Sequence, residues 1–161
     1  MARSPPLLFA WITYFLMFSS WVIILGGVSA SQRYCGAASA DAITAGGGAG
    51  YFAPVPCDHL YQFTWWITWY EFALVIIVPI ILGLGKVHTW RYGLIGVILP
   101  ATYLLMATAN SFFTLRLNIN NNRGGPRTVL AGSIIGSVAN FFMIILLGIR
   151  DESPKSASET S

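Results

Sequence analysis

One carboxylate, Glu71, interrupts the long apolar segments of this sequence. It follows the aromatic stretch "TWWITWY" and precedes the uncharged run "ALVIIVPIILGLG". A charge in such a run is costly in a bilayer unless it meets a polar partner or water, so intramembrane carboxylates indicate functional sites by default. Thr64, Thr68 and Glu71 are spaced i, i+4 and i+7, and therefore lie on one face of a helix.

The partners of Glu71 must come from neighbouring helices at a similar depth. Counting inward from the expected ends of the next two apolar segments reaches Asn110 on one, and Gly136, one turn before Asn140, on the other. Arg116 lies about one turn shallower than Asn110.

Two interpretations of this level stay open. The first is a functional polar site, whose pore or polar-site candidates are Glu71, Thr68, Thr64, Asn110, Asn140 and Arg116. The second is structural: an ion pair between Glu71 and Arg116, or interhelical hydrogen bonds that hold the helices together.

The composition indicates that the bilayer is the solvent of these elements. Of 161 residues, 55 % are apolar and 9 % are charged, against about a quarter charged in soluble domains. Four segments reach the roughly 20 residues that a helix needs to span a bilayer. We predict an all-α integral membrane protein, a four-transmembrane-helix bundle over 1–149, with spans at about 6–29, 63–85, 92–117 and 128–149, followed by a disordered cytoplasmic tail, 150–161.

The first span includes a competing signal. "GVSA", residues 27–30, is similar to a signal-peptidase site, but the apolar segment before it is longer than a usual signal core. We therefore expect the segment to be retained as a span. The net charge of +3 forms no basic patch, which argues against nucleic acid as a partner.

The longest loop, between the first two spans, holds both cysteines, Cys35 and Cys57. Two cysteines in one loop suggest a disulfide in an oxidising compartment, worth about 3 kcal/mol for a loop of this size. The disulfide would place the loop outside and both termini in the cytoplasm, with the plasma membrane as the expected location. His59, in the same loop, is a candidate for the outer mouth, with a plain solvated residue as the alternative.

The remaining motifs are few. Gly132 and Gly136 form a GxxxG pair, which would pack helices within the protomer or drive self-association. No metal-ligand cluster, phosphate loop or nucleophile–base pair is evident, so we expect no metal, no cofactor and no enzyme.

Two resemblances follow from these features. Four spans with a cysteine pair in the first outer loop resemble the claudin-like and MARVEL-like proteins, although no tryptophan lies between Trp21 and Trp65, where the claudin signature has one. "RSPPLLFAWITYFLMFSSWVIILGG" resembles the limiting-CO2-inducible plasma-membrane protein of green algae. That second resemblance implies a homo-oligomer, a trimer, that passes a small inorganic-carbon species such as CO2.

The sequence thus supports two hypotheses. One is a homo-oligomeric channel or facilitator for a small solute, with Glu71 on the path. The other is a four-span scaffold, adhesion or accessory subunit that transports nothing, in which the buried polar residues hold the bundle together.

Overall fold

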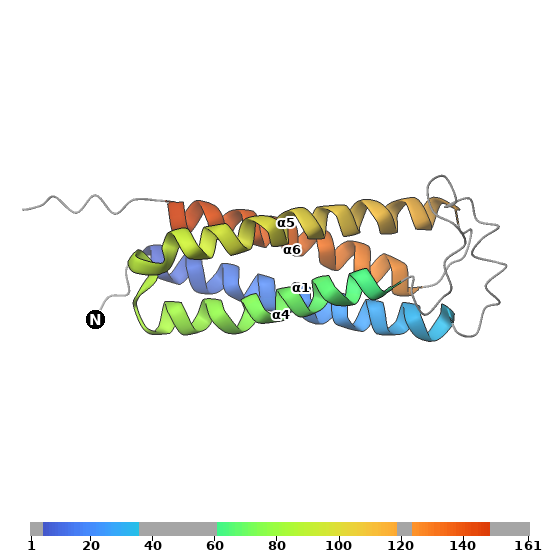
Figure 1. Ribbon diagram of the computed structural model, residues 1–161, viewed down its shortest axis with the longest axis horizontal. Helices are drawn as coiled ribbons and strands as arrows, with labels where there is room; N and C mark the ends of the chain where they lie inside the picture. Colours follow the sequence, from blue (N-terminus) through green and yellow to red (C-terminus); the bar gives the residue numbers. More distant parts are fainter. Residues whose placement is uncertain (1–4, 36–60, 119–123, 149–161) are drawn as a thin grey trace, which may run out of the picture.

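Four long helices form an elongated antiparallel bundle in the computed structural model (Figure 1). The structure describes residues 5–35, 61–118 and 124–148. The helices are α1 (Pro5–Cys35), α4 (Gln62–Gly83), α5 (Val87–Asn118) and α6 (Gly124–Gly148). Within these described ranges no strand occurs.

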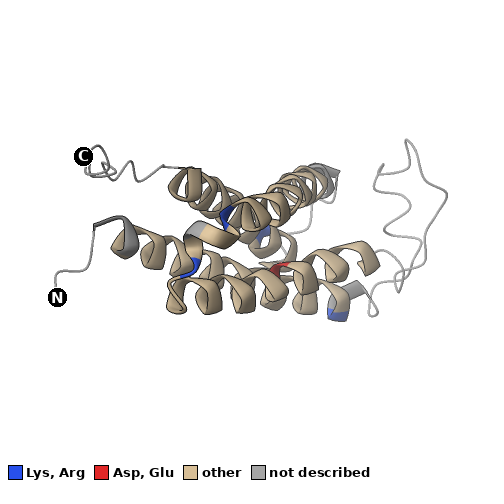
Figure 2. Ribbon diagram, turned by 60° about the vertical axis from the view of Figure 1, so that its left-hand side comes forward, with Lys and Arg blue, Asp and Glu red and all other residues tan. Residues whose placement is uncertain are grey.

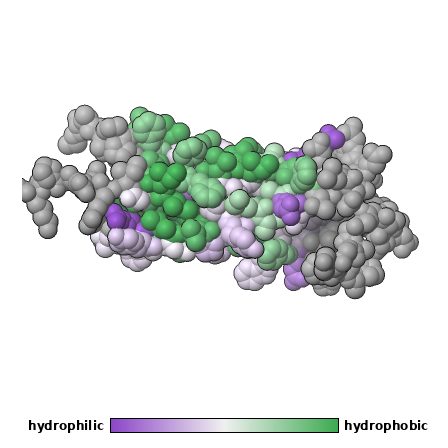
Figure 3. Space-filling view, turned by 90° about the horizontal axis from the view of Figure 1, so that it is seen from above, coloured by the Kyte–Doolittle hydropathy of each residue, from purple (hydrophilic) through white to green (hydrophobic). Residues whose placement is uncertain are grey.

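Each helix is long and apolar enough to cross a membrane. The spans run over Leu8–Arg33, Gln62–Gly83, Thr89–Phe113 and Gly124–Gly148. Hydrophobic side chains extend along the face shown in Figure 3, and strongly hydrophilic residues lie near its two ends. Many large apolar side chains point outward, which suits lipid as the surrounding solvent and would be costly in water.

The four helices are not equally close to one another. Helix α6 packs extensively against both α1 and α5, whereas α4 packs more sparsely against α1 and α5. Helices α4 and α6 therefore lie on a diagonal of the bundle. Both begin at the same end, here named the Tyr61 end, and run parallel to each other (Figure 1).

Small residues bring the backbones of α1 and α6 together. A Cβ added to Gly27 would lie 2.8 Å from the backbone nitrogen of Val129. A Cβ on Gly125 would lie 3.0 Å from the backbone nitrogen of Ser31. Since backbone atoms cannot rotate away, this seam depends on glycine at both positions.

The GxxxG pair of α6 belongs to the same interior. A Cβ on Gly132 would lie 3.1 Å from the backbone nitrogen of Ile24 in α1. A Cβ on Gly136 would lie 2.9 Å from Leu105 of α5. Ser20 of α1 donates a 2.8 Å hydrogen bond to the Gly132 carbonyl oxygen. Both glycines therefore pack against helices of the same protomer.

Helix α4 is held mainly by long side chains. Trp21 Nε1 donates to the Thr68 carbonyl oxygen at 3.1 Å, and Trp65 Nε1 donates to Gln32 Oε1 at 2.7 Å. On the other side, the Tyr70 hydroxyl donates to the Val97 carbonyl oxygen of α5 at 3.0 Å. These bonds link α4 to its neighbours without requiring close approach of the backbones.

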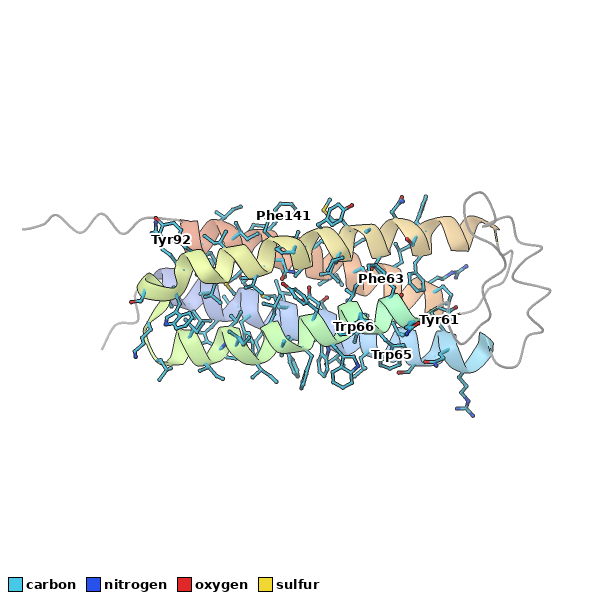
Figure 4. All side chains as sticks on the ribbon, in the orientation of Figure 1. Tyr61, Phe63, Trp65, Trp66, Tyr92 and Phe141 are labelled. Atoms are coloured by element: carbon cyan, nitrogen blue, oxygen red, sulfur yellow. The ribbon has the colours of Figure 1, made fainter. Side chains whose placement is uncertain are left out.

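Aromatic side chains lie at both ends of the bundle and also along its length, where Phe141 is labelled (Figure 4). Figure 4 shows Tyr61, Phe63, Trp65 and Trp66 grouped where α4 begins, and Tyr92 near the opposite end. Tryptophan and tyrosine concentrate at the two membrane–water interfaces of integral membrane proteins. The distribution therefore matches a bundle whose long axis crosses the bilayer.

A matched pair of alanine substitutions in α1 tests the seam. Gly27→Ala should lower the free energy of unfolding by about 1–3 kcal/mol, because the new methyl group meets the backbone of α6. Gly26→Ala is the control, since nothing lies within 4 Å of its added Cβ, and it should leave stability unchanged or raise it by about 0.5–1 kcal/mol. Thermal unfolding in detergent measures both. Equal melting temperatures for the two variants would contradict the close α1–α6 contact.

Candidate functional site

Glu71 lies inside the bundle and reaches across its diagonal. Its side chain is 3 % exposed, and that of Asn140 in α6 is 0 % exposed. Asn140 Nδ2 donates a hydrogen bond to Glu71 Oε1 at 3.2 Å. The bond joins α4 to α6, two helices that make little direct contact, so it passes through the middle of the bundle.

Two polar stripes converge on this bond. On α4, Thr64, Thr68 and Glu71 are all buried. On α6, residues with the same i, i+4, i+7 spacing are buried as well: Ser133, Ser137 and Asn140. Asn140 and Glu71 are 69 residues apart, and because the helices are parallel, the same offset pairs the other members of the stripes. The stripes are therefore in register from near the Tyr61 end to the Glu71 level.

Most hydroxyl protons of this interior are already used. Thr68 donates to the Thr64 carbonyl oxygen at 2.8 Å, and Ser137 donates to the Ser133 carbonyl oxygen at 2.8 Å. Thr102 and Thr108 of α5 donate to carbonyl oxygens of their own helix in the same way. A hydroxyl that has donated its proton still offers acceptor lone pairs, so these groups present acceptors to the interior.

Two buried polar atoms lack a partner. Asn140 Oδ1 and Ser133 Oγ are both enclosed and make no hydrogen bond to any described residue. Leaving such a group unsatisfied costs about 1–3 kcal/mol, and native interiors normally supply a partner or an ordered water. Each of these atoms, two helical turns apart on α6, therefore has capacity for a further hydrogen bond.

The predicted residues separate into two groups. Thr64, Thr68, Glu71 and Asn140 all lie in the interior, and Glu71 meets Asn140 directly. Asn110 has an exposed side chain, outside this buried interior. Arg116 belongs to α5, but its side chain is outside the described residues, as are His59 and Cys57 and the side chain of Cys35.

The depth count placed Gly136 level with Glu71, and the structure pairs Glu71 with Asn140 instead. Helix α6 also begins earlier than expected, at Gly124 rather than near residue 128. The sequence "GGPR" is typical of a loop. Proline is nevertheless well tolerated in the first turn of a helix, because N–H groups there have no acceptor within the helix and none is lost. Asn140 lies 16 residues after Gly124, whereas Glu71 lies nine residues after Gln62, so α6 extends beyond the start of α4 at the Tyr61 end and a count from the helix start falls short of the true level.

Ser133 and Ser137 were not singled out from the sequence. The spacing of polar residues in "SIIGSVAN" repeats that of "TWWITWYE" and was the available signal. A serine in an apolar helix is unremarkable by itself, and only the parallel arrangement of α4 and α6 gives the repeat a meaning.

Charge is sparse in the described bundle (Figure 2). Glu71 is its one acidic residue, and the described basic side chains lie toward helix ends: Arg33, Lys86, Arg91 and Arg127. Among the described residues no group of three His, Cys, Asp or Glu side chains could hold a metal ion.

These features define an integral membrane protein of the four-helix-bundle class, with a buried polar interior. The bundle is similar to the crystal structure of the LCI1 channel of Chlamydomonas reinhardtii, with a TM-score of 0.75 at 19 % identity, covering 91 % of this chain and 97 % of that one. The resemblance to the limiting-CO2-inducible protein is therefore confirmed at the level of the fold.

The sequence comparison finds relatives of a different kind, which are named as signaling proteins. The chain is 27 % identical over 99 residues to the high osmolarity signaling protein SHO1 of Meyerozyma guilliermondii, and 31 % identical over 99 residues to SHO1 of Clavispora lusitaniae. These alignments cover 62 % of this chain and 33 % and 31 % of the two relatives. The chain thus spans about a third of the length of the curated relatives it matches. No family model matches the chain.

The diagonal hydrogen bond can be tested with a double-mutant cycle. Glu71→Leu and Asn140→Leu should each lower the free energy of unfolding by about 1–3 kcal/mol, because each leaves a buried polar partner unsatisfied. The double variant should recover most of the loss, since both polar groups are then gone. Glu71→Leu combined with Ser111→Ala is the control, because Ser111 is exposed and bonds its own helix. Additive losses in the first cycle would show that the two side chains do not interact.

Proposed function

We propose that the protein is a channel or facilitator for a small solute, working as a homo-oligomer. The observation that carries the proposal is the pair of buried polar stripes that runs from near the Tyr61 end to Glu71 and Asn140. Polar and ionisable residues inside a membrane bundle mark solute or proton pathways, because their cost must be offset by a role. Similarity to the fold of a channel supports the same class.

The solute is small on this proposal. The stripes consist of threonine, serine, one amide and one carboxyl, with no array of charges of the kind that coupled ion transporters use. The resemblance to the limiting-CO2-inducible protein nominates CO2 or another inorganic-carbon species, carried by a trimer in the plasma membrane.

A second candidate function is a membrane module for signalling or scaffolding that transports nothing. The observation in its favour is the sequence similarity to SHO1, whose name describes a high osmolarity signaling protein. In this case the diagonal bond and the aromatic hydrogen bonds of α4 would set the geometry of the bundle, and partners would be bound outside the membrane.

The proposal includes a topology. A disulfide between Cys35 and Cys57 would place the Tyr61 end outside and both termini in the cytoplasm. The structure supports the geometry of one part of this: Cys35 ends α1 at the same end of the bundle where α4 begins.

Flux into proteoliposomes tests the function. The protein should raise the permeability of the membrane to at least one small solute above that of protein-free vesicles, with CO2, bicarbonate, methylammonium and glycerol as the panel. Glu71→Gln should fold and should change that flux roughly tenfold, because a charge-assisted hydrogen bond is worth about 1.5–3 kcal/mol. Ser111→Ala is the matched control and should match the wild type. Unchanged permeability for every solute would refute the channel and favour the signalling module.

Thiol labelling tests the topology. We expect non-reducing mass spectrometry to find Cys35 linked to Cys57 within one chain, and no labelling of intact cells by an impermeant maleimide. After reduction, labelling should appear without permeabilisation, because both cysteines face outward. Labelling that requires permeabilisation would reverse the topology, and labelling without reduction would remove the disulfide.

A further inference from the structure

We infer that the polar interior binds a small cation that carries N–H donors, of the ammonium class, and does not bind bicarbonate. The inference rests on the proposed function, a channel for a small solute, and it names an ammonium-class cation as that solute in place of the inorganic-carbon species that the resemblance nominates. It follows from three properties of the described side chains: their hydrogen-bond acceptors, their charge and their number at each level.

Acceptors dominate the interior. Thr68 and Ser137 donate their protons to carbonyl oxygens of their own helices, which leaves lone pairs facing the bundle. Asn140 Oδ1 is a buried acceptor without a partner. A carboxylate accepts only, and one Glu71 oxygen already receives the Asn140 amide, so the carboxylate's remaining capacity is also for donors. The stripe donors that make no hydrogen bond to another described residue are the second N–H of Asn140 and the hydroxyls of Thr64 and Ser133.

The interior of the described bundle contains a single carboxyl group. Glu71 is the acidic residue of the described bundle, and no described lysine or arginine side chain is buried. An anion such as bicarbonate would therefore meet acceptor oxygens and, when Glu71 is ionised, a carboxylate, with no buried cation among the described side chains to offset them. At low local dielectric this repulsion is much stronger than in water. A cation would instead neutralise the carboxylate.

The number of oxygens at one level favours a cation with directed donors over a bare metal ion. At the Glu71 level the described side chains offer the carboxyl and Asn140 Oδ1, and the next acceptors lie one helical turn away on each stripe. A metal ion needs a shell of converging oxygens, commonly six or more for hard cations. An N–H-bearing cation is satisfied by two or three hydrogen bonds in fixed directions, which this level can supply.

Equilibrium binding to the purified protein in lipid nanodiscs tests the inference independently of transport. The probe is methylammonium chloride, with potassium chloride and choline bicarbonate at the same ionic strength as the comparisons. Tryptophan fluorescence reports the site, because Trp21 donates to the Thr68 carbonyl oxygen, one turn from Glu71. We expect a saturable change with methylammonium and affinities at least about tenfold weaker for potassium and bicarbonate.

Three variants assign that signal to the interior. Glu71→Gln should weaken methylammonium binding at least about tenfold, since it removes the charge and keeps the shape. Ser137→Ala should weaken it about fivefold, the value of one hydrogen bond. Ser111→Ala is its matched control, because Ser111 makes the same bond to its own helix on the exposed surface. If Glu71→Gln fails to fold, the comparison of the two serine variants decides the assignment.

The outcomes separate this inference from the channel proposal. Saturable bicarbonate binding that depends on Glu71, equal binding of potassium and methylammonium, or no saturable change with any salt would overturn the inference. Methylammonium binding without flux of any solute would support it and remove the channel function. Bicarbonate flux without methylammonium binding would overturn the inference and support the channel function.

Discussion

The hydrogen bond between Asn140 and Glu71 is the constraint on which the interior depends. A carboxyl group in a membrane bundle needs a polar partner. Helix α4 packs sparsely against its two neighbours, α1 and α5, and no described residue of either helix donates a hydrogen bond to Glu71. The partner instead comes from α6, across the diagonal. That bond fixes how far α4 and α6 are shifted along each other. The threonines of α4 then lie at the same depth as the serines of α6. A single pair of long side chains thus sets the register of six buried polar residues.

The bundle uses two different ways of holding helices, and the difference explains where the polar residues lie. Between α1 and α6 the glycines permit backbone contact, which leaves no room for side chains and gains packing energy over a long seam. Between α4 and its neighbours the contacts are made by tryptophan and tyrosine, whose length holds the backbones apart. Short hydroxyl side chains can then be buried on α4 and α6 without direct contact between them. The small residues of one interface and the large residues of another together create the polar diagonal.

Hydropathy was sufficient to predict four spanning helices, because a bilayer imposes length and polarity on every span. The Thr64–Glu71 stripe was also evident, since helical periodicity assigns residues to a face. The face that each helix turns inward was not evident from one sequence. Asn110 was expected near Glu71 and is exposed, whereas Thr108 on the same helix is buried. Two residues correspond to roughly 200° of rotation around a helix. Depth counted from the sequence was wrong by one turn on α6, where Asn140 rather than Gly136 meets Glu71. The rotation of α5 is decided by packing against α4 and α6.

The likeness to the LCI1 structure shows the fold, and the SHO1 relatives cover only part of their own length, so the function of the interior has to be judged by its chemistry. If the stripes served only to hold helices together, each buried polar atom would gain most from a partner on another helix. Instead, several hydroxyl groups bond to their own backbone, and these bonds add nothing between helices. Asn140 Oδ1 and Ser133 Oγ have no described partner at all. One cross-bundle bond satisfies the structural need of Glu71, and the remaining acceptors exceed it. That surplus is what a solute with donors would use, and it is the physical basis of the binding site that we propose between α4 and α6.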